Sequence, residues 1–392
     1  MTEELFKRDG YAFEFEAKVL LSEGDEVELD ATAFYPGGGG QVCDTGKIRG
    51  LEVTEVLYKK GRIVHRVPGN CLRPGDTVWC SVDWDRRYDL MKGHTGEHLL
   101  FCSLRRQVPE LSINKIYISP ENKYVIVDRD ISWDDIRAAL VFANLAIRDN
   151  LPITKTIMGR DDPELDRVRI KKEKIPEGED VSVVSIGDID ISACSGIHVM
   201  ETGELELMFV DRKVSAGKDG IAIHFKVGDG AKDTAVLLAN TCLKASDAAD
   251  SKPDDLVRAV SNMRSELEMI KRTAGLFVKK HIASLIPTTV GGVDVVGGVF
   301  PPVDRSILSD AAESCKNSGK VCILMSAGDS VSVVMSSGTD KVDCSAILSE
   351  TLGRFGGRGG GKPDFAQGGV TDASVSERLF TDLMEETVAR LH

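Results

Sequence analysis

The sequence predicts an α+β protein built from several domains, and three observations carry this prediction. A chain of 392 residues is too long for one compact core and suits two or three domains. Short segments in which apolar and polar residues alternate dominate up to residue 90, and a helical stretch begins near residue 231. We therefore expect a β-rich, β-barrel-like domain at 1–90, an α+β domain at 91–230, a helical hairpin at 231–287 and an α/β domain at 288–392.

The first ninety residues are predicted to form short strands. Residues 11–20 and 26–35 alternate apolar with polar side chains, and turn residues separate such segments. Residues 47–67 are predicted to form a hairpin that turns at Lys59-Lys60-Gly61.

Helices and strands mix in the next part of the chain. One helix is predicted from near Asp85, and a second spans 133–148 with Trp133 and two aspartates at its start. Strand-like runs follow at 181–186, 205–210 and 221–227. The first two of these runs enclose the loop that carries Cys194.

Beyond residue 231 the composition becomes helical. Apolar residues from Leu256 to Phe277 recur at alternating four- and three-residue steps, so this helix packs either on its own partner at 231–248 or on a second copy. The last hundred residues alternate strand-like with helix-like segments. Between two of these helices, Gly356 to Gly369 is expected to form no regular element, because it is so rich in glycine.

Composition narrows the function classes. No run of eighteen apolar residues occurs, and the amino terminus lacks the basic and apolar parts of a secretory signal, so we expect no membrane partner. Nine scattered cysteines indicate a reducing, cytoplasmic setting. A net charge of −13 argues against coating nucleic acid by charge alone, although local basic stretches occur at 167–174 and 354–362.

Two short motifs have the spacing of metal ligands. HTGEH places His94 and His98 on one face of a helix, one turn apart, and CSGIH repeats this spacing with Cys194 and His198. One thiolate and three imidazoles complete a tetrahedral zinc shell, so we expect one zinc ion per chain. Glu97 directly precedes the second histidine, and we expect it to point away from the ligand face, unlike a metalloprotease base.

A third motif is the run of four glycines that follows Pro36 in ATAFYPGGGGQVCDTG. Such a run permits close backbone approach to a ligand, although composition alone favours a flexible hairpin loop. Thr32, Gln41 and Asp44 supply nearby polar groups that could recognise a small substrate with a hydroxyl group.

Together these motifs resemble the editing domain of alanyl-tRNA synthetase and of the freestanding AlaX editing proteins. The segment GGRGGGKPDFAQGG is similar to the glycine-rich motif of the DHH-associated domain, which ends the synthetases and the large AlaX form. Because the editing unit begins almost at residue 1, no synthetase catalytic domain is expected. The chain departs from the common CGGTH motif at Ser195 and Ile197 and from HTATH at Gly96 and Glu97, but keeps every ligand position.

The resemblance implies a trans-editing hydrolase that deacylates Ser-tRNA(Ala), and Gly-tRNA(Ala) as a second substrate, with tRNA(Ala) as partner. It implies zinc at the four ligands above and catalytic-site roles for Thr32, Gln41, Gly39 and Gly40, with Thr32 bonding the serine hydroxyl. Arg358 and Lys362 are expected to contact tRNA, since glycines allow phosphates to approach them. A turn packed inside its own domain is the alternative for that segment, and a homodimer through the helical segment and the C-terminal domain is a further expectation.

Three alternatives concern the zinc and the substrate. A zinc with four protein ligands is usually structural, so it either positions the ester and polarises water or only shapes the pocket. A non-catalytic, zinc-stabilised tRNA-binding protein is one rival. A zinc hydrolase of a free metabolite is another, although such an enzyme needs no C-terminal tRNA clamp.

Overall fold

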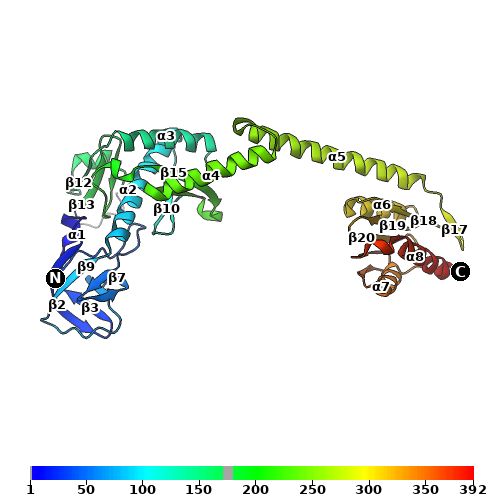
Figure 1. Ribbon diagram of the computed structural model, residues 1–392, viewed down its shortest axis with the longest axis horizontal. Coiled ribbons are helices and arrows are strands. Elements are labelled where there is room, and N and C mark those ends of the chain that lie inside the picture. Colours follow the sequence, from blue (N-terminus) through cyan, green and yellow to red (C-terminus); the bar gives the residue numbers. More distant parts are fainter. Residues whose placement is uncertain (1, 171–179) are drawn as a thin grey trace. The chain divides into compact units, whose positions relative to one another are not determined.

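A computed structural model describes residues 2–170 and 180–392, and these form two compact units (Figure 1). Unit 1 spans Met1–Lys244 and unit 2 spans Ala245–His392. The basic stretch expected at 167–174 falls outside the described residues from position 171 onward. No helix in the described part of the chain is long and apolar enough to cross a membrane.

Unit 1 begins with a nearly closed, barrel-like sheet of seven strands, as the alternating pattern predicts. Its strands run in the order β6-β5-β9-β2-β3-β8-β7, and the two edge strands, β6 and β7, follow one another in the chain. The strands are β2 (Glu14–Glu23), β3 (Glu26–Leu29), β5 (Gly46–Ile48), β6 (Leu51–Val53), β7 (Glu55–Lys59), β8 (Arg62–Arg66) and β9 (Thr77–Val82). The predicted hairpin is confirmed as β7–β8, where Lys60 and Gly61 take positive φ.

Short elements close the amino-terminal end of this sheet. Strand β1 (Glu3–Glu4) pairs in parallel with β4 (Ala31–Thr32), and α1 (Leu5–Arg8) follows β1 directly. Phe6 of α1 is buried against the core and meets Tyr35 edge-on. This packing holds the chain that leads to the glycine motif.

Two helices and two smaller sheets form the rest of unit 1. Helix α2 (Trp84–Gln107) is buried along most of its length, and α3 (Trp133–Arg148) has the predicted bounds, with the Ser132 hydroxyl capping its first turn. One sheet has the order β10-β11-β16-β15 and the other β12-β13-β14. Their strands are β10 (Ile113–Ile118), β11 (Lys123–Val127), β12 (Ile153–Met158), β13 (Val181–Ile186), β14 (Asp190–Ala193), β15 (Met208–Ser215) and β16 (Ile221–Val227).

The strand predicted at 205–210 is wrong at its beginning. Residues Thr202–Leu205 form a 3-10 turn, η3, which Glu201 and Glu204 close with a capping box. Glu206 then takes a φ of 59°, so the strand begins only at Met208. Strand β14, which the pattern did not predict, ends one residue before Cys194 and fixes the start of that loop.

Helices α4 (Gly228–Ala248) and α5 (Leu256–Ser284) occupy the predicted helical stretch. Within its own unit α5 leaves its apolar residues exposed, including Val260, Leu267 and Phe277. The remaining 3-10 turns are η1 (Pro163–Arg167), η4 (Gly217–Asp219), η5 (Pro253–Asp255) and η6 (Ala373–Val375).

Unit 2 carries a six-stranded sheet in the order β17-β18-β19-β20-β22-β21. Only the pair β18–β19 is parallel. The strands are β17 (Thr288–Val290), β18 (Val293–Phe300), β19 (Val321–Ala327), β20 (Val331–Ser337), β21 (Arg358–Lys362) and β22 (Phe365–Val370). Helices α6 (Arg305–Asn317), α7 (Cys344–Arg354) and α8 (Ser376–Leu391) lie within the predicted segments and pack on this sheet (Figure 1).

The expectation that Gly356 to Gly369 forms no regular element is wrong, because this segment is the antiparallel hairpin β21–β22. The glycines serve close packing. A Cβ at Gly359 would lie 2.7 Å from Cδ1 of Leu352, and one at Gly368 would lie 2.4 Å from the same atom. Glycine is therefore what allows α7 to lie directly on the hairpin.

Candidate metal centre

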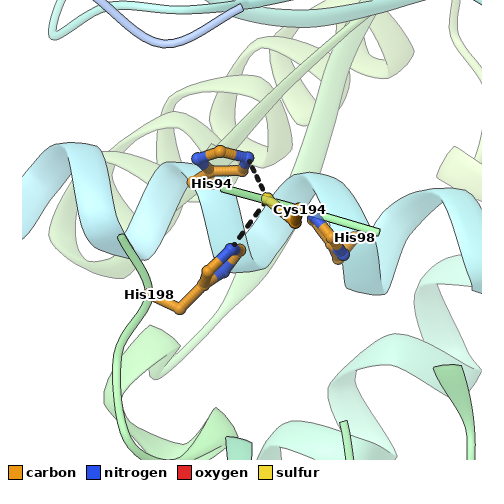
Figure 2. Close-up of side chains that lie close together, drawn as sticks. All are labelled: His94, His98, Cys194 and His198. Carbon is orange, nitrogen blue, oxygen red and sulfur yellow. Dashed lines mark hydrogen bonds between the residues drawn. The ribbon is translucent and has the colours of Figure 1, made fainter. Parts of the chain in front are cut away.

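The structure brings the four predicted ligands of unit 1 together. One ligand atom each from His94, His98, Cys194 and His198 lies within 4.8 Å of the others (Figure 2). Two of these residues come from successive turns of α2 and two from the loop after β14. Residues about a hundred positions apart in the chain thus form one compact group of imidazoles and a thiol.

Glycine at position 196 is what allows the loop to approach α2. A Cβ at Gly196 would lie 2.1 Å from Cε1 of His94, which is closer than real atoms come. The loop is also held by the backbone hydrogen bond from Cys194 N to Ser182 O, at 2.9 Å. The loop therefore meets the helix at a fixed place.

Each of the three imidazoles uses its Nδ1 for a hydrogen bond to a neighbouring side chain. His94 Nδ1 lies 2.7 Å from Oε1 of Gln41, and His98 Nδ1 lies 2.7 Å from Oγ of Ser192. His198 Nδ1 lies 3.1 Å from Oγ1 of Thr95.

The Gln41 oxygen can only accept, and the Ser192 hydroxyl donates to Oδ2 of Asp190, so His94 and His98 each carry a proton on Nδ1. The Thr95 hydroxyl can accept from Nδ1 of His198 in the same way. The Nε2 atoms of His94 and His198 lie 3.4 and 3.3 Å from Sγ of Cys194 (Figure 2). Outer hydrogen bonds of this kind are what orient histidines as metal ligands.

Electrostatics favour the ligand forms of these groups. Burial opposes ionisation of the Cys194 thiol, but His94, His198 and His98 outweigh it and hold its pKa well below the ordinary value. Burial lowers the pKa of His198 to about 4, so that this imidazole is neutral. A thiolate beside a neutral imidazole is ready for a soft divalent cation.

His98 differs from His198. Burial lowers its pKa, but the charge of Cys194 and the hydrogen bond to Asp190 raise the pKa to about 10. A metal ion must therefore displace a proton from His98 when it binds, which makes metal affinity dependent on pH.

The expectation that Glu97 points away from the ligands is wrong. Its Oε2 lies 3.7 Å from Nε2 of His98, the nitrogen that faces the other ligands. The side chain is fully buried, and neither carboxylate oxygen has a hydrogen-bond partner among the described residues. Because Glu97 is also three residues after His94, it lies on the flank of the ligand face. A buried carboxylate without a donor favours a cation beside it.

The glycine motif lies against this group. Gly37 to Gly40 all take positive φ, and a Cβ at Gly39 would lie 3.8 Å from Cε1 of His94. The loop is bonded to β10 through Ile118 N to Gly40 O at 2.8 Å and Val42 N to Ile118 O at 3.0 Å. Gly39, Gly40 and Gln41 are thus placed next to the metal ligands by an ordered loop. The buried Nε2 of Gln41 has no partner among the described residues.

Thr32 is not brought into contact with the metal ligands. Its side chain is fully buried, and its Oγ1 lies 2.8 Å from Nε2 of His65 and accepts a hydrogen bond from Phe34 N. His65 Nδ1 lies 3.1 Å from Val27 O, so Nε2 is the acceptor for the Thr32 hydroxyl. Asp44 is likewise occupied, because it forms a fully buried ion pair with Arg87.

Arg358 and Lys362 lie in unit 2, at the two ends of β21. Both side chains are exposed, and the described residues offer neither of them an ion pair. Their spacing of four residues in a strand places them on the same face of the hairpin.

Sequence reasoning missed the residues that orient the ligands, namely Thr95, Asp190 and Ser192. Ser192 and Thr95 touch histidines that are 94 and 103 positions away in the chain, so no local pattern marks them. Sequence motifs identified the four ligands because two residues of each pair lie close in the chain.

Three family models match this chain. The model described as tRNA synthetases class II (A) covers residues 7–86, and the threonyl and alanyl tRNA synthetase second additional domain covers 181–218, which includes Cys194 and His198. The DHHA1 domain model covers 293–390. An alanyl-tRNA editing protein AlaX-L from Pyrococcus horikoshii is 27% identical over the full length of both chains. The chain is thus similar over its whole length to an alanyl-tRNA editing protein of the AlaX type.

The chain is also similar in sequence to parts of longer proteins. Alanine–tRNA ligase of Methanoregula boonei is 29% identical over 100% of this chain and 44% of its own length. The enzyme of Pyrobaculum arsenaticum is 31% identical over 94% of this chain and 42% of its own length. The chain thus spans less than half the length of these ligases. The C-Ala domain of Aquifex aeolicus alanyl-tRNA synthetase aligns with 26% of this chain at 26% identity and a TM-score of 0.25, too low to support a statement about the fold.

Proposed function

We propose that this AlaX-like chain is an aminoacyl-tRNA deacylase that hydrolyses Ser-tRNA(Ala), with Gly-tRNA(Ala) as a second substrate. One observation supports it most. Three imidazoles, each with its Nδ1 bonded to Gln41, Ser192 or Thr95, face a thiol beside an ordered glycine loop. A ligand group with this orientation in a chain similar to an editing protein suits a hydrolytic site.

The resident metal is proposed to be one zinc ion per chain. Three neutral-nitrogen donors and one thiolate are the ligand set that zinc prefers, and the buried, unpartnered carboxylate of Glu97 beside His98 fits a bound cation. Zinc bound here would supply Lewis-acid stabilisation and orientation next to the ester. Gln41, Ser192 and Thr95 hold the three histidines in the ligating tautomer.

The chain's own groups would handle the reacting ester. Backbone amides of the loop at Gly39 and Gly40 are proposed to face the developing oxyanion, because glycines take positive φ at low cost and leave room for close approach. A positioned water attacks the ester carbonyl, and the tRNA 3′ oxygen leaves. The bonds of the loop to β10 hold these amides in place.

Recognition of the serine hydroxyl by Thr32 remains a proposal from the family resemblance. Serine differs from alanine by one hydroxyl group, and an aminoacylation site rejects this added group poorly. A site that selects serine must therefore offer the hydroxyl a hydrogen-bond partner. Since the Thr32 hydroxyl already donates to His65 inside the core, a substrate hydroxyl would have to donate to the remaining lone pair of Thr32. The fully buried position also means that the surrounding residues must move to admit it.

One observation favours a second candidate, a non-catalytic tRNA-binding protein stabilised by zinc. Four protein ligands already fill a tetrahedral shell, and filled shells are usually structural. The deciding assay compares the zinc-loaded chain on Ser-, Gly- and Ala-tRNA(Ala) and on a short seryl ester. The deacylase predicts turnover of Ser-tRNA(Ala) well above that of the other charged forms. No turnover with a full complement of zinc favours the second candidate, and equal turnover of the short ester favours a metabolite hydrolase.

The partners follow from this function. Arg358 and Lys362 are proposed to contact tRNA phosphates, and the double change to alanine should weaken tRNA(Ala) binding and lower its salt dependence by about one to two units of slope. The cytoplasm, where charged tRNA is used, is the proposed location.

A homodimer is proposed through α5 and the C-terminal domain. Val260, Leu267 and Phe277 are exposed within unit 2, and burying such a row is the usual drive for helix pairing. Light scattering of the intact protein should give twice the mass of one chain. Leu267→Glu should lower the measured mass to that of a single chain.

A further inference from the structure

A second feature of unit 1 adjoins the metal ligands. A cavity of about 220 Å³ lies against the loop that carries His198 and is lined on its other sides by residues 6–11 and by strands β12 and β13. Lys7, Arg8 and Lys155 line it, together with Gly196 and His198. It is smaller than the roughly 300–1,000 Å³ of typical small-molecule sites, so it suits a fragment of a larger ligand.

The strand register shows which way Lys155 faces. Lys155 of β12 is paired with Val184 of β13, and Val184 is paired with Ser192 of β14. Directly paired residues in an antiparallel sheet point to the same face. Ser192 uses that face to reach His98, so Lys155 emerges on the side of the sheet that carries the metal ligands.

The cavity has an excess of positive charge, although the chain as a whole is acidic. Three cations line it against one carboxylate, that of Asp9. Lys7 and Arg8 are paired with Glu4 and Glu3. The described residues provide no ion pair or hydrogen bond for the ammonium group of Lys155.

Burial, followed by the charge of Lys7, lowers the pKa of Lys155, against the opposing effect of Cys194. By surface area Lys155 is exposed at the cavity wall, so an incoming anion can reach its unpaired ammonium group.

The chemistry of an aminoacyl ester restricts what that anion can be. Its amino acid has no free carboxylate and carries an amino group that a lysine would repel. The nearest negative charge on such a substrate is the phosphate that joins the last nucleotide to the one before it. A cation at the wall of the hydrolytic site would therefore meet phosphate.

We propose that this cavity binds the phosphate next to the aminoacylated 3′ nucleotide of the RNA, and that Lys155 makes the contact. The inference rests on the proposed deacylase function. Lys155 acts as a positioning residue, because it holds the RNA end while the ester reaches the metal ligands. When the RNA strand is held at this phosphate, the stretch of RNA between the phosphate and the ester has a fixed length. The ester is therefore brought to a defined position in the site.

The test uses the full-length, zinc-loaded protein and an acceptor-stem RNA minihelix that ends in CCA. Lys155→Ala should raise the Kd of the protein for this minihelix about tenfold, which is the scale expected when one charge-assisted contact is lost. The slope of log Kd against log salt should fall by about 0.7. Lys155→Arg should restore most of the affinity. Lys18→Ala is the matched control, because Lys18 is an exposed strand lysine of the same unit without an ion pair among the described residues.

A minihelix without its three 3′ nucleotides should bind wild type and Lys155→Ala equally. An equal loss for both RNAs would instead make Lys155 a general surface charge, and a Kd within twofold of wild type for the CCA-ended RNA would exclude the contact. Displacement of the CCA-ended RNA by an equal concentration of inorganic phosphate would assign the cavity to free phosphate. Zinc content must stay the same in every variant, since a loss of zinc would make Lys155 structural.

A deacylation assay with the seryl minihelix separates this inference from the function that it builds on. Lys155→Ala should raise KM about tenfold and leave kcat within a few-fold, while turnover of a short seryl ester stays unchanged. A wild-type protein that deacylates nothing would remove the proposed function. The Kd comparison would still decide the phosphate contact.

Discussion

His94 donates its Nδ1 proton to Oε1 of Gln41 over 2.7 Å, and this bond joins the glycine motif to the first metal ligand. The two residues lie 53 positions apart, His94 in α2 and Gln41 in the loop between β4 and β5. The bond explains why a glutamine follows the four glycines. It fixes the tautomer of His94 and places the glycine backbone beside the ligand group.

Gln41→Ala should weaken zinc binding about 10- to 100-fold, because it removes the acceptor that orients His94. Gln41→Glu should keep most of the affinity, since a carboxylate accepts the same proton. Competition with a chromophoric chelator measures both, and circular dichroism checks the fold. Equal affinity in wild type and Gln41→Ala would show that the bond does not orient the ligand.

Glu97→Gln should weaken zinc binding, because it removes a buried negative charge 3.7 Å from Nε2 of His98. Urea unfolding of the metal-free and zinc-loaded forms measures this effect as a smaller gain in stability on zinc binding. The control is Glu16→Gln on the exposed face of β2, which should leave that gain unchanged. A gain in Glu97→Gln equal to that of wild type contradicts the account.

Thr32→Val should destabilise unit 1 by about 1–3 kcal/mol, because Nε2 of the fully buried His65 loses its donor. Thr32→Ser keeps the hydroxyl and should cost only about 1 kcal/mol for the lost methyl group. Denaturant midpoints of the two variants test this order. If Thr32 also bonds the substrate, the serine variant should keep its preference for Ser-tRNA(Ala) over Ala-tRNA(Ala).

His65 should make stability depend on pH in the mildly acidic range. Burial lowers its pKa from 6.5 to about 4, so the unfolded chain takes up a proton first as the pH falls. The contribution of neutral His65 is fully present above pH 6.5 and is lost as the pH falls towards about 4, by at most about 3 kcal/mol. His65→Gln lacks this titration and keeps an acceptor for Thr32. A wild type whose stability falls no faster than that of the variant over this range would disprove the assignment.

Local signals made part of this structure predictable. Helix α3 has the bounds expected from the sequence, because Ser132 caps it and aspartates fill its first turn. The metal ligands could be found because each pair shares one turn or one short loop. The hairpin β7–β8 could be predicted from the turn at Lys59-Lys60-Gly61, where Gly61 suits a positive φ.

The remainder depends on contacts between distant residues. Leu352 of α7 packs against Gly359 and Gly368 of the hairpin, and no feature of residues 356–369 alone reveals that neighbour. The orientation of Glu97 depends on how α2 is buried, whereas the motif indicates only the position of Glu97 along the helix. Ser192 and Thr95 acquire their roles only when the loop after β14 meets α2.

The central claim is that the group of His94, His98, Cys194 and His198 holds zinc and supports deacylation. The most direct measurement is zinc content together with Ser-tRNA(Ala) turnover, in wild type and Cys194→Ala, before and after metal removal by a chelator. The account predicts one zinc per chain in wild type, turnover that is lost with the metal and returns on adding zinc, and neither property in the variant. Full turnover by metal-free wild type, with the fold unchanged, would contradict it.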